Sequence, residues 1–336
     1  IRANNSITLP EFFSNRFRED KKVILTLAAA FILIFFTVYA ASCFVTCGKL
    51  FSTLFGTKYE LMMILGAVFV LLYTILGGFL AESASDFMQG IVMIVALAVI
   101  VVISTKNAGG FGAVMENAKS IPGFFEFFGL ASPSVNAEGT QLVEAGAPVL
   151  GAAADYGVLS VVPLMAWGPG YFGMPQVLLR FMAIRDEKEL TASRRIATIW
   201  VVISLAVAVF IGVVGRSLYP TELLTASDAE NVFIVLSTNL LPALLAGFVM
   251  AGILAATISS SDSYLLIAAS AFAKNIYQGI FKKDATDKQV MTISRLTLLA
   301  IAAVAIVIAL DENSVIFTIV SFAWAGFGAT FGPLML

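Results

Sequence analysis

Eight long apolar runs separated by short polar loops constrain this chain more than any other feature of its sequence. Each run has about the 20 residues that a helix needs to cross the hydrocarbon of a bilayer. The runs occupy residues 22–48, 59–81, 86–105, 156–181, 196–217, 242–272, 290–310 and 313–336. At 59% hydrophobic and 12% charged residues, the chain carries more apolar surface than one soluble core could bury. No run alternates as a barrel strand does, so the sequence predicts an all-α membrane protein, a polytopic helical bundle.

Basic residues gather at three places along the chain, and they predict an orientation. They precede the first run and follow the fourth and the sixth. By the positive-inside rule, residues 1–21, 182–195 and 273–289 are predicted to be cytoplasmic loops, and residues 106–155 an external loop. A loop as long as the external one is either a lid or a floppy insertion, and its composition favours the insertion.

Several kinds of chemistry are not indicated. The chain has no histidine, which removes imidazole catalysis and histidine metal sites. Cys43 and Cys47 share a helix face without CxxC spacing, so unpaired packing thiols are expected. A net charge of −2 and the lack of a basic tract give no indication of nucleic-acid binding.

The fourth run contains helix-breaking residues, in PLMAWGPGYFGMPQVLLR at 163–180. In hydrocarbon, unwound backbone is tolerated only where protein buries it or where it lines a watery cavity. Trp167 and Tyr171 are four residues apart and would share a helical face, with Pro175 following. The segment is either a substrate site at mid-membrane with aromatic walls or a kinked packing helix, and its residues alone leave both open.

The sixth run contains a cluster of hydroxyl groups in ATISSSDSYLL. Helical geometry brings the Ala256 carbonyl toward the hydroxyls of Ser259 and Ser260, at i+3 and i+4. Neutral oxygens suit a cation that must be released again, although such serines also bond back to their own helix. The neighbouring Asp262 favours an ion path, because intramembrane carboxylates usually mark one.

Three other features leave alternatives open. Asp86, in LAESASDFMQG, either caps the third run or marks the inner exit of a cation path. Tyr39 is an isolated hydroxyl, which is usually a satisfied packing residue. The stretch WAGFGATFGP, residues 324–333, indicates a hinge or a close helix crossing.

Together these segments resemble the solute:sodium symporter family, secondary transporters with an inverted-repeat core of the leucine-transporter type. The resemblance is carried, in order, by NNSITLPEFFSNRF, LLYTILGGFLAESASD, LMAWGPGYFGMPQVLLRFMA, ILAATISSSDSYLL and FAWAGFGATFGP. It implies that residues 1–336 are part of a single transmembrane transporter domain. The eight runs would be the third to tenth helices of a ten-helix core, with the first two core helices missing and the tenth cut near its end.

The resemblance also implies roles for individual residues. Sodium would be bound by the Ala256 carbonyl and the hydroxyls of Ser259 and Ser260. It would be the only metal, and no further cofactor is implied. Asp86 would serve in sodium coupling and release. The substrate-binding residues would be Tyr39, Trp167, Tyr171, Pro175 and Ser263, and Tyr171 would act as an inner aromatic gate.

The function that the resemblance implies is transport and not enzymatic catalysis. Inward movement of sodium would drive uptake of L-proline across the cell membrane by alternating access, with the lipid bilayer as the surrounding partner. The alternatives are a sodium symporter for another small solute, such as a different amino acid, a betaine-like solute or a carboxylate, and a transporter-like sensory module of a signalling protein.

Overall fold

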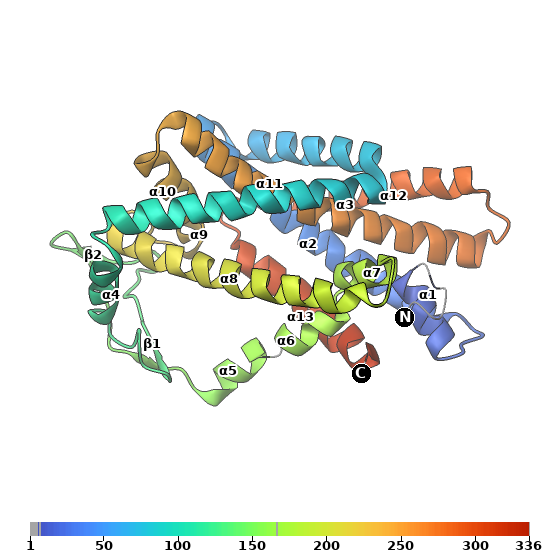
Figure 1. Ribbon diagram of the computed structural model, residues 1–336, viewed down its shortest axis with the longest axis horizontal. Coiled ribbons are helices and arrows are strands. Elements are labelled where there is room, and N and C mark those ends of the chain that lie inside the picture. The colour runs from blue at the N-terminus through green and yellow to red at the C-terminus, as the bar shows by residue number, and fades with distance from the viewer. Residues whose placement is uncertain (1–5, 7, 166, 336) are drawn as a thin grey trace. The chain divides into compact units, whose positions relative to one another are not determined.

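The structure is a computed structural model that describes residues 6, 8–165 and 167–335, without the side chains of residues 77–81, 163 and 169. It is built mainly of helices (Figure 1). The longest are α2 (Val23–Phe55), α3 (Tyr59–Asn107), α8 (Glu189–Leu218), α11 (Ala243–Ser270), α12 (Asp287–Ile308) and α13 (Ile316–Met335). The shorter ones are α1 (Leu9–Arg16), α4 (Phe111–Lys119), α5 (Val158–Met165), α6 (Trp167–Gly170), α7 (Pro175–Ala183), α9 (Ala226–Ala229) and α10 (Val232–Leu240). A 3₁₀ helix, η2 (Tyr171–Gly173), precedes α7, and a π-helix, η3 (Ala271–Phe281), extends α11.

Within the described residues, seven helices are long and apolar enough to cross a membrane. They are Val23–Phe55, Tyr59–Leu76, Glu82–Asn107, Glu189–Leu218, Ala243–Phe281, Asp287–Ile308 and Ile316–Met335. Each corresponds to one of the predicted apolar runs. The predicted polytopic helical membrane protein is therefore confirmed.

The remaining predicted run, residues 156–181, is broken into short pieces, as its prolines and glycines led us to expect. Met174 has extended backbone, with ψ at 112°, between the end of η2 and the start of α7. Pro175 opens α7 at a position where its missing N–H leaves no helical hydrogen bond unmade. The run consequently has no helix of spanning length among the described residues.

The chain divides into two compact units. The first comprises Ile1–Phe87, Met165–Arg194 and Thr257–Leu336, and the second Met88–Leu164 and Arg195–Ala256. This division does not test the predicted single transporter domain, which stays a prediction.

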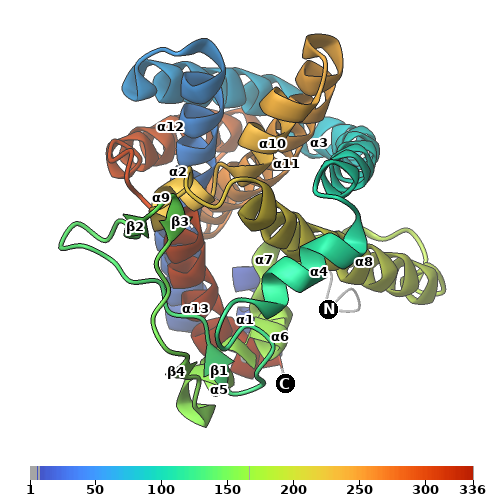
Figure 2. The same ribbon diagram turned by 90° about the vertical axis from the view of Figure 1, so that its left-hand side faces the viewer.

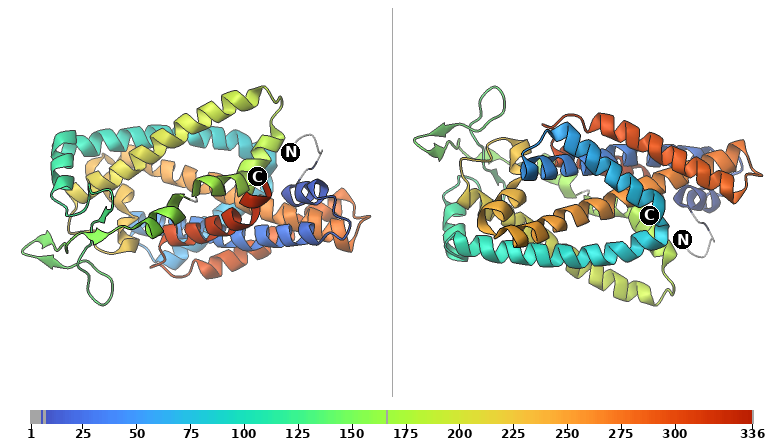
Figure 3. Two further views of the ribbon diagram at one scale, coloured as in Figure 1. Left: turned by 90° about the horizontal axis from the view of Figure 1, so that it is seen from below. Right: turned by 90° about the horizontal axis from the view of Figure 1, so that it is seen from above.

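In the first unit, α2 is the central helix. It packs against α1, α12, α13 and η3, and α13 in turn packs against α6 and η2. The pairing of α2 with α13 is visible as a blue helix beside a red one (Figure 3). Aromatic rings fill the contact, since Phe36 and Phe327 lie 4.7 Å apart between centroids and both are fully buried.

Helix α3 bends back on itself before it reaches the second unit. The Tyr73 hydroxyl donates a hydrogen bond to the Ser85 hydroxyl, 12 residues further along the same helix. A straight α-helix would separate the two residues by about 18 Å. The bend therefore lies between them and separates the two predicted runs 59–81 and 86–105.

The second unit has its own apolar core and a folded loop. Ala96, Ile100, Ile211, Leu236, Leu241, Ala246 and Val249 form the core. The predicted external loop 106–155 contains α4 and four short strands, which pair antiparallel as β1 (Gly129–Leu130) with β4 (Ala154–Asp155) and β2 (Val143–Glu144) with β3 (Ala147–Pro148) (Figure 2).

Gln141 anchors this loop within the second unit. Its side chain accepts a hydrogen bond from Arg216 at 3.0 Å, and its backbone N–H donates to Leu224. The loop is therefore more ordered than the floppy insertion that its composition favoured.

Two of the predicted cytoplasmic loops, 1–21 and 273–289, contain helix in the structure. Helix η3 continues to Phe281, and α12 begins after a capping box in which Thr286 and Gln289 bond to each other's backbone N–H. Most of the predicted loop 273–289 is thus helical. The predicted loop 1–21 includes α1, whose apolar side is buried. Which side of the membrane each loop faces stays a prediction.

Candidate functional site

An arginine on α7 joins three polar side chains from two other helices. Arg180 Nη2 lies 2.6 Å from Asp86 Oδ2 and 3.4 Å from Glu82 Oε1, both on α3. The same nitrogen donates to Ser263 Oγ on α11 at 3.0 Å. Ser263 Oγ also donates to Glu82 Oε1 through a very short contact. These four residues form a polar cluster inside the first unit.

The carboxylates near Arg180 are buried and incompletely satisfied. Glu82 is 4% exposed and Ser263 is 2% exposed, while the adjacent Asp262 is fully buried. Among the described residues, Asp86 Oδ1 and Asp262 Oδ2 are buried without a hydrogen-bond partner. Buried polar atoms are rarely left unpaired, and a carboxylate oxygen of this kind can accept a proton donor or a cation.

The polar cluster opens onto a cavity of about 620 Å³ within the first unit. Its polar lining side chains include Thr74, Glu82, Gln176, Arg180, Ser263 and Arg295. A cavity of this volume can hold a small organic solute with its hydration water.

An aromatic cluster surrounds Trp324 of α13. The indole Nε1 donates to the Tyr39 hydroxyl at 2.9 Å, and the ring stacks on Trp167 at 4.6 Å. Tyr171 meets the same indole edge-on at 4.9 Å. Tyr264 stacks on Tyr39 at 4.1 Å. Three of the predicted substrate-binding residues, Tyr39, Trp167 and Tyr171, therefore meet in one place.

The broken segment also packs closely against α13, as its alternative interpretation as a packing helix predicted. A Cβ added to Gly170 would lie 3.5 Å from the Cα of Gly328 on α13. A Cβ added to Gly173 would lie 2.5 Å from the backbone nitrogen of Gly332 and 2.6 Å from the carbonyl oxygen of Phe327. Both interpretations of the segment are thus compatible, because the same close crossing brings Trp324 against Trp167.

We expect Gly173→Ala to destabilise the protein by about 1–3 kcal/mol, because the added methyl has only backbone atoms to displace. Gly168→Ala is the matched control, since no atom lies within 4 Å of its added Cβ. Thermal melting of both variants of the full-length protein in detergent measures the difference. Equal melting temperatures would show that the crossing is looser than described.

The other two predicted substrate-binding residues have partners outside the aromatic rings, and their role in substrate binding stays a prediction. Pro175 is the buried first residue of α7, and Ser263 belongs to the polar cluster with Arg180. Neither has a described contact with the aromatic rings. Along the chain, the first turn of α7 lies between Tyr171 of the aromatic cluster and Arg180 of the polar cluster.

The predicted sodium ligands lie on one continuous helix. Ala256, Ser259 and Ser260 are half-buried in α11, so their spacing is helical as expected. Tyr264 is within hydrogen-bonding reach of Ser260 and of Tyr39. The ligand assignment itself stays a prediction.

Asp86 lies just after the bend in α3, near the start of the span Glu82–Asn107. It lies inside α3, which the structure describes as helical from Tyr59 to Asn107. Ser85 bonds back to the Glu82 carbonyl and not to a helix end. Both interpretations of Asp86, as a cap of the third run and as the inner exit of a cation path, stay predictions.

Sequence reasoning missed four residues that hold these clusters together: Glu82, Arg180, Tyr264 and Trp324. Arg180 lies within α7, near the end of the predicted run 156–181, and was not among the predicted site residues. Tyr264 follows Ser260 by four residues, and this spacing could have placed it on the same face.

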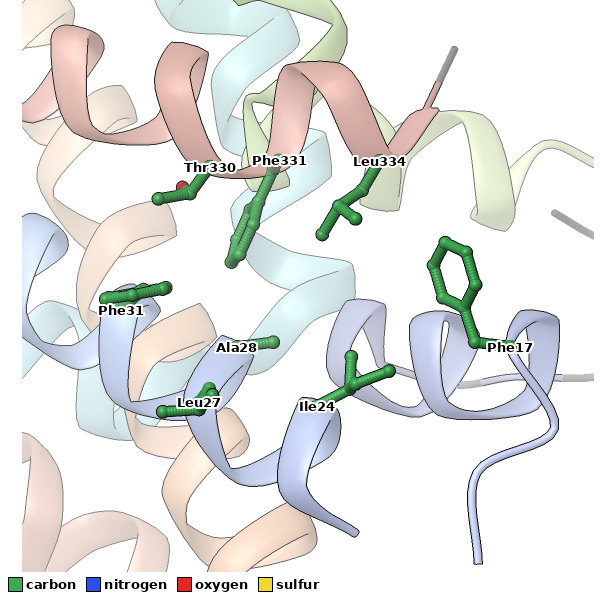
Figure 4. Close-up of a pocket in the computed structure, with 8 residues that line it drawn as sticks. All are labelled: Phe17, Ile24, Leu27, Ala28, Phe31, Thr330, Phe331 and Leu334. Carbon is green, nitrogen blue, oxygen red and sulfur yellow. The ribbon is translucent and has the colours of Figure 1, made fainter.

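A second cavity of about 320 Å³ contains none of the predicted site residues. Figure 4 shows its lining side chains directed toward one another from α2, α13 and the end of α1. They are Phe17, Ile24, Leu27, Ala28, Phe31, Thr330, Phe331 and Leu334. The lining of this cavity is apolar apart from Thr330, whose hydroxyl donates to the Gly326 carbonyl of its own helix.

A polytopic bundle with a helix broken beside buried carboxylates has the architecture of a secondary transporter. The sodium:solute symporter family matches residues 1–336. A solved structure of a Na⁺-coupled sialic acid symporter in a substrate-bound, outward-open state shares this fold. The TM-score is 0.72 at 17% identity, over 99% of this chain and 66% of that one.

Curated relatives are similar over nearly the whole chain. The osmoregulated proline transporter OpuE of Bacillus subtilis (strain 168) is 36% identical over 99% of this chain and 63% of its own length. The high-affinity proline transporter PutP of the same strain is 37% identical over 100% and 66%. The sodium/proline symporter of Staphylococcus aureus is 36% identical over 99% and 61%. This chain therefore spans less than two thirds of the length of these relatives.

The chain belongs to the sodium:solute symporter family. It is a multi-pass protein of the cell membrane, and its family consists of transporters and not enzymes.

Proposed function

We propose that the protein couples inward movement of sodium to uptake of L-proline by alternating access. The observation that carries the proposal is the aromatic cluster. It joins Trp167 and Tyr171 of the broken segment to Tyr264 of α11, the helix that also contains the predicted sodium ligands. The names of the relatives support proline as the cargo, since all three transport it.

The aromatic cluster suits the chemistry of proline. Its compact apolar ring can pack against Trp167 and Tyr171, and its cationic ring nitrogen can lie over an aromatic face. The break starts a new helix at Pro175, and N–H groups in the first turn of a helix lack helical partners, so they can meet the carboxylate.

The ion site would be built from neutral oxygens on α11. The carbonyl of Ala256 and the hydroxyls of Ser259 and Ser260 are hard but weak ligands, which let a monovalent cation leave again. Each sodium charge that moves inward gains about 2.3 kcal/mol per 100 mV of membrane potential.

Coupling between ion and substrate would pass through Tyr264. This buried side chain reaches Ser260 on one side and Tyr39 on the other. Sodium that orders Ser260 would also order the aromatic cluster, so each ligand would tighten the binding of the other.

Ser259→Ala and Ser260→Ala should each raise the sodium concentration for half-maximal uptake by about 10-fold, because each removes one oxygen ligand; this change corresponds to about 1.4 kcal/mol of binding free energy. Ser261→Ala is the control in the same cluster, because the Ser261 hydroxyl bonds back to Ile258. Sodium titration of uptake by the full-length protein gives the values. An unchanged half-saturating sodium concentration in both variants would exclude the two hydroxyls as sodium ligands.

Competition by unlabelled solutes tests the cargo. Labelled proline taken up by the full-length protein should be displaced best by unlabelled proline, and poorly by betaine-like solutes or simple carboxylates. Stronger displacement by another solute would keep the transporter and change its cargo. Binding of proline without accumulation would instead indicate a sensory module.

A further inference from the structure

We propose that Arg180 is a tethered cation that competes with sodium for Asp86. In this account the guanidinium occupies the carboxylate while sodium is absent, and sodium binding displaces it toward the cavity. The inference rests on the proposed function, because it assigns a mechanism to sodium release at Asp86.

The contacts of Arg180 are those of a displaceable group. Among the described residues, a single guanidinium nitrogen, Nη2, makes all of its hydrogen bonds, to Asp86, Ser263 and Glu82. A paired fork of two parallel hydrogen bonds, which makes arginine–carboxylate contacts strong and specific, is not formed. The arginine side chain is 42% exposed, whereas Asp86 is 12% exposed. The guanidinium is therefore the more accessible partner of the pair.

The charge balance also calls for a second cation. Three carboxylates, Glu82, Asp86 and Asp262, lie together, and within the described part of the chain Arg180 is the only cationic side chain that bonds to any of them. Its contact with Asp86 uses Oδ2 and leaves the buried Oδ1 unpaired, as Asp262 Oδ2 also is. Uncompensated carboxylates are costly to bury, and a small hard cation can use such oxygens.

A place for the displaced guanidinium exists. Arg180 lines the cavity of about 620 Å³, together with the polar side chains of Gln176 and Thr74. Gln176 Oε1 is buried without a partner among the described residues, so it can accept a hydrogen bond from the displaced guanidinium. The displaced guanidinium would exchange its acceptors on α3 and α11 for the amide oxygen of Gln176.

Arg180 would also link sodium binding to the aromatic cluster. Arg180 is on the short helix α7, which begins at Pro175 directly after the segment that holds Tyr171. Five residues of helix separate Arg180 from Pro175 by about 7.5 Å. While Arg180 is bound to α3 and α11, it fixes α7 and with it the broken segment. Its release would free α7 to move as one piece.

The first test compares sodium titrations of proline uptake by the full-length protein and its variants. In Arg180→Gln the half-saturating sodium concentration should fall at least 5-fold, because the competing charge is gone, while Arg180→Lys should stay within about 2-fold of the unsubstituted protein. Arg185→Gln is the matched control, since Arg185 is 88% exposed and bonds to Glu189. An unchanged or higher half-saturation in Arg180→Gln would overturn the proposal and make Arg180 a fixed structural contact.

A second measurement uses the unsubstituted protein and does not depend on a variant that folds. An arginine-reactive dicarbonyl reagent, read out by peptide mass spectrometry, should modify Arg180 at least 3-fold faster in sodium than in potassium, with Arg185 unaffected. An equal rate in both salts would contradict displacement. Absence of sodium-dependent uptake by the unsubstituted protein would refute the proposed function, whereas sodium-dependent uptake with unchanged Arg180 behaviour would refute only this inference.

Discussion

Asp86→Asn should raise the half-saturating sodium concentration at least 10-fold, and this is the largest expected effect of a single polar substitution. The change removes a charge that lies 2.6 Å from Arg180 while keeping the size of the side chain. Hydrogen bonds to charged groups contribute about 1.5–3 kcal/mol, which corresponds to roughly 10- to 100-fold in an equilibrium.

The control for Asp86→Asn is Asp284→Asn, in the exposed segment between η3 and α12. Sodium titration of uptake by the full-length protein, normalised to the amount in the membrane, gives both values. Normal sodium half-saturation in Asp86→Asn would remove Asp86 from the ion path and leave it as a structural partner of Arg180.

Trp167→Ala should weaken apparent proline affinity by about 10- to 100-fold while leaving sodium half-saturation within a few-fold. Trp167 stacks on Trp324 at 4.6 Å and on Phe317 at 5.8 Å, so its loss opens the wall of the aromatic cluster. Each aromatic pair contributes about 0.5–1.5 kcal/mol beyond its buried area. Trp167→Phe should recover part of the affinity, because it restores a ring.

Trp200→Ala is the matched control for this substitution. Trp200 lies on α8 in the second unit and belongs to none of the clusters described above. Direct binding of labelled proline to purified full-length protein, together with a thermal melt, separates affinity from folding. Normal proline affinity in well-folded Trp167→Ala would contradict the aromatic binding site.

The helical architecture could be predicted from the sequence because the bilayer imposes it. Apolar runs of spanning length have few other stable structures, and seven of the eight became long helices. The broken run was also predictable, since proline and glycine act on the local backbone. The sequence indicated a gap between two runs but not that α3 bends back on itself there. The bend is shown by the contact between Tyr73 and Ser85, which the sequence does not reveal.

The candidate site was only partly predictable, for a physical reason. Tyr39, Trp167 and Tyr171 each attracted attention by their type and setting, and the structure brings them together. Trp324, which joins them, is distant in sequence, and no local periodicity connects α13 to α2 and α6. Arg180 was not among the predicted site residues, because a basic residue near the end of an apolar run usually faces water. Only tertiary packing shows that it lies beside two carboxylates of α3.

The ordered external loop shows the same limit. Its composition resembles that of a flexible insertion, yet two strand pairs and the contacts of Gln141 give it structure. Pairing of two-residue strands depends on residues brought close by the rest of the fold, which a composition argument does not contain.

The most direct test of the central claim is uptake of labelled proline by the full-length protein in sealed vesicles, under an inward sodium gradient and under an equal potassium gradient. We expect accumulation above equilibrium only with sodium, increased by an inside-negative potential because sodium carries its charge inward. Equal uptake with sodium and potassium, or uptake that never exceeds equilibrium, would contradict sodium-coupled transport.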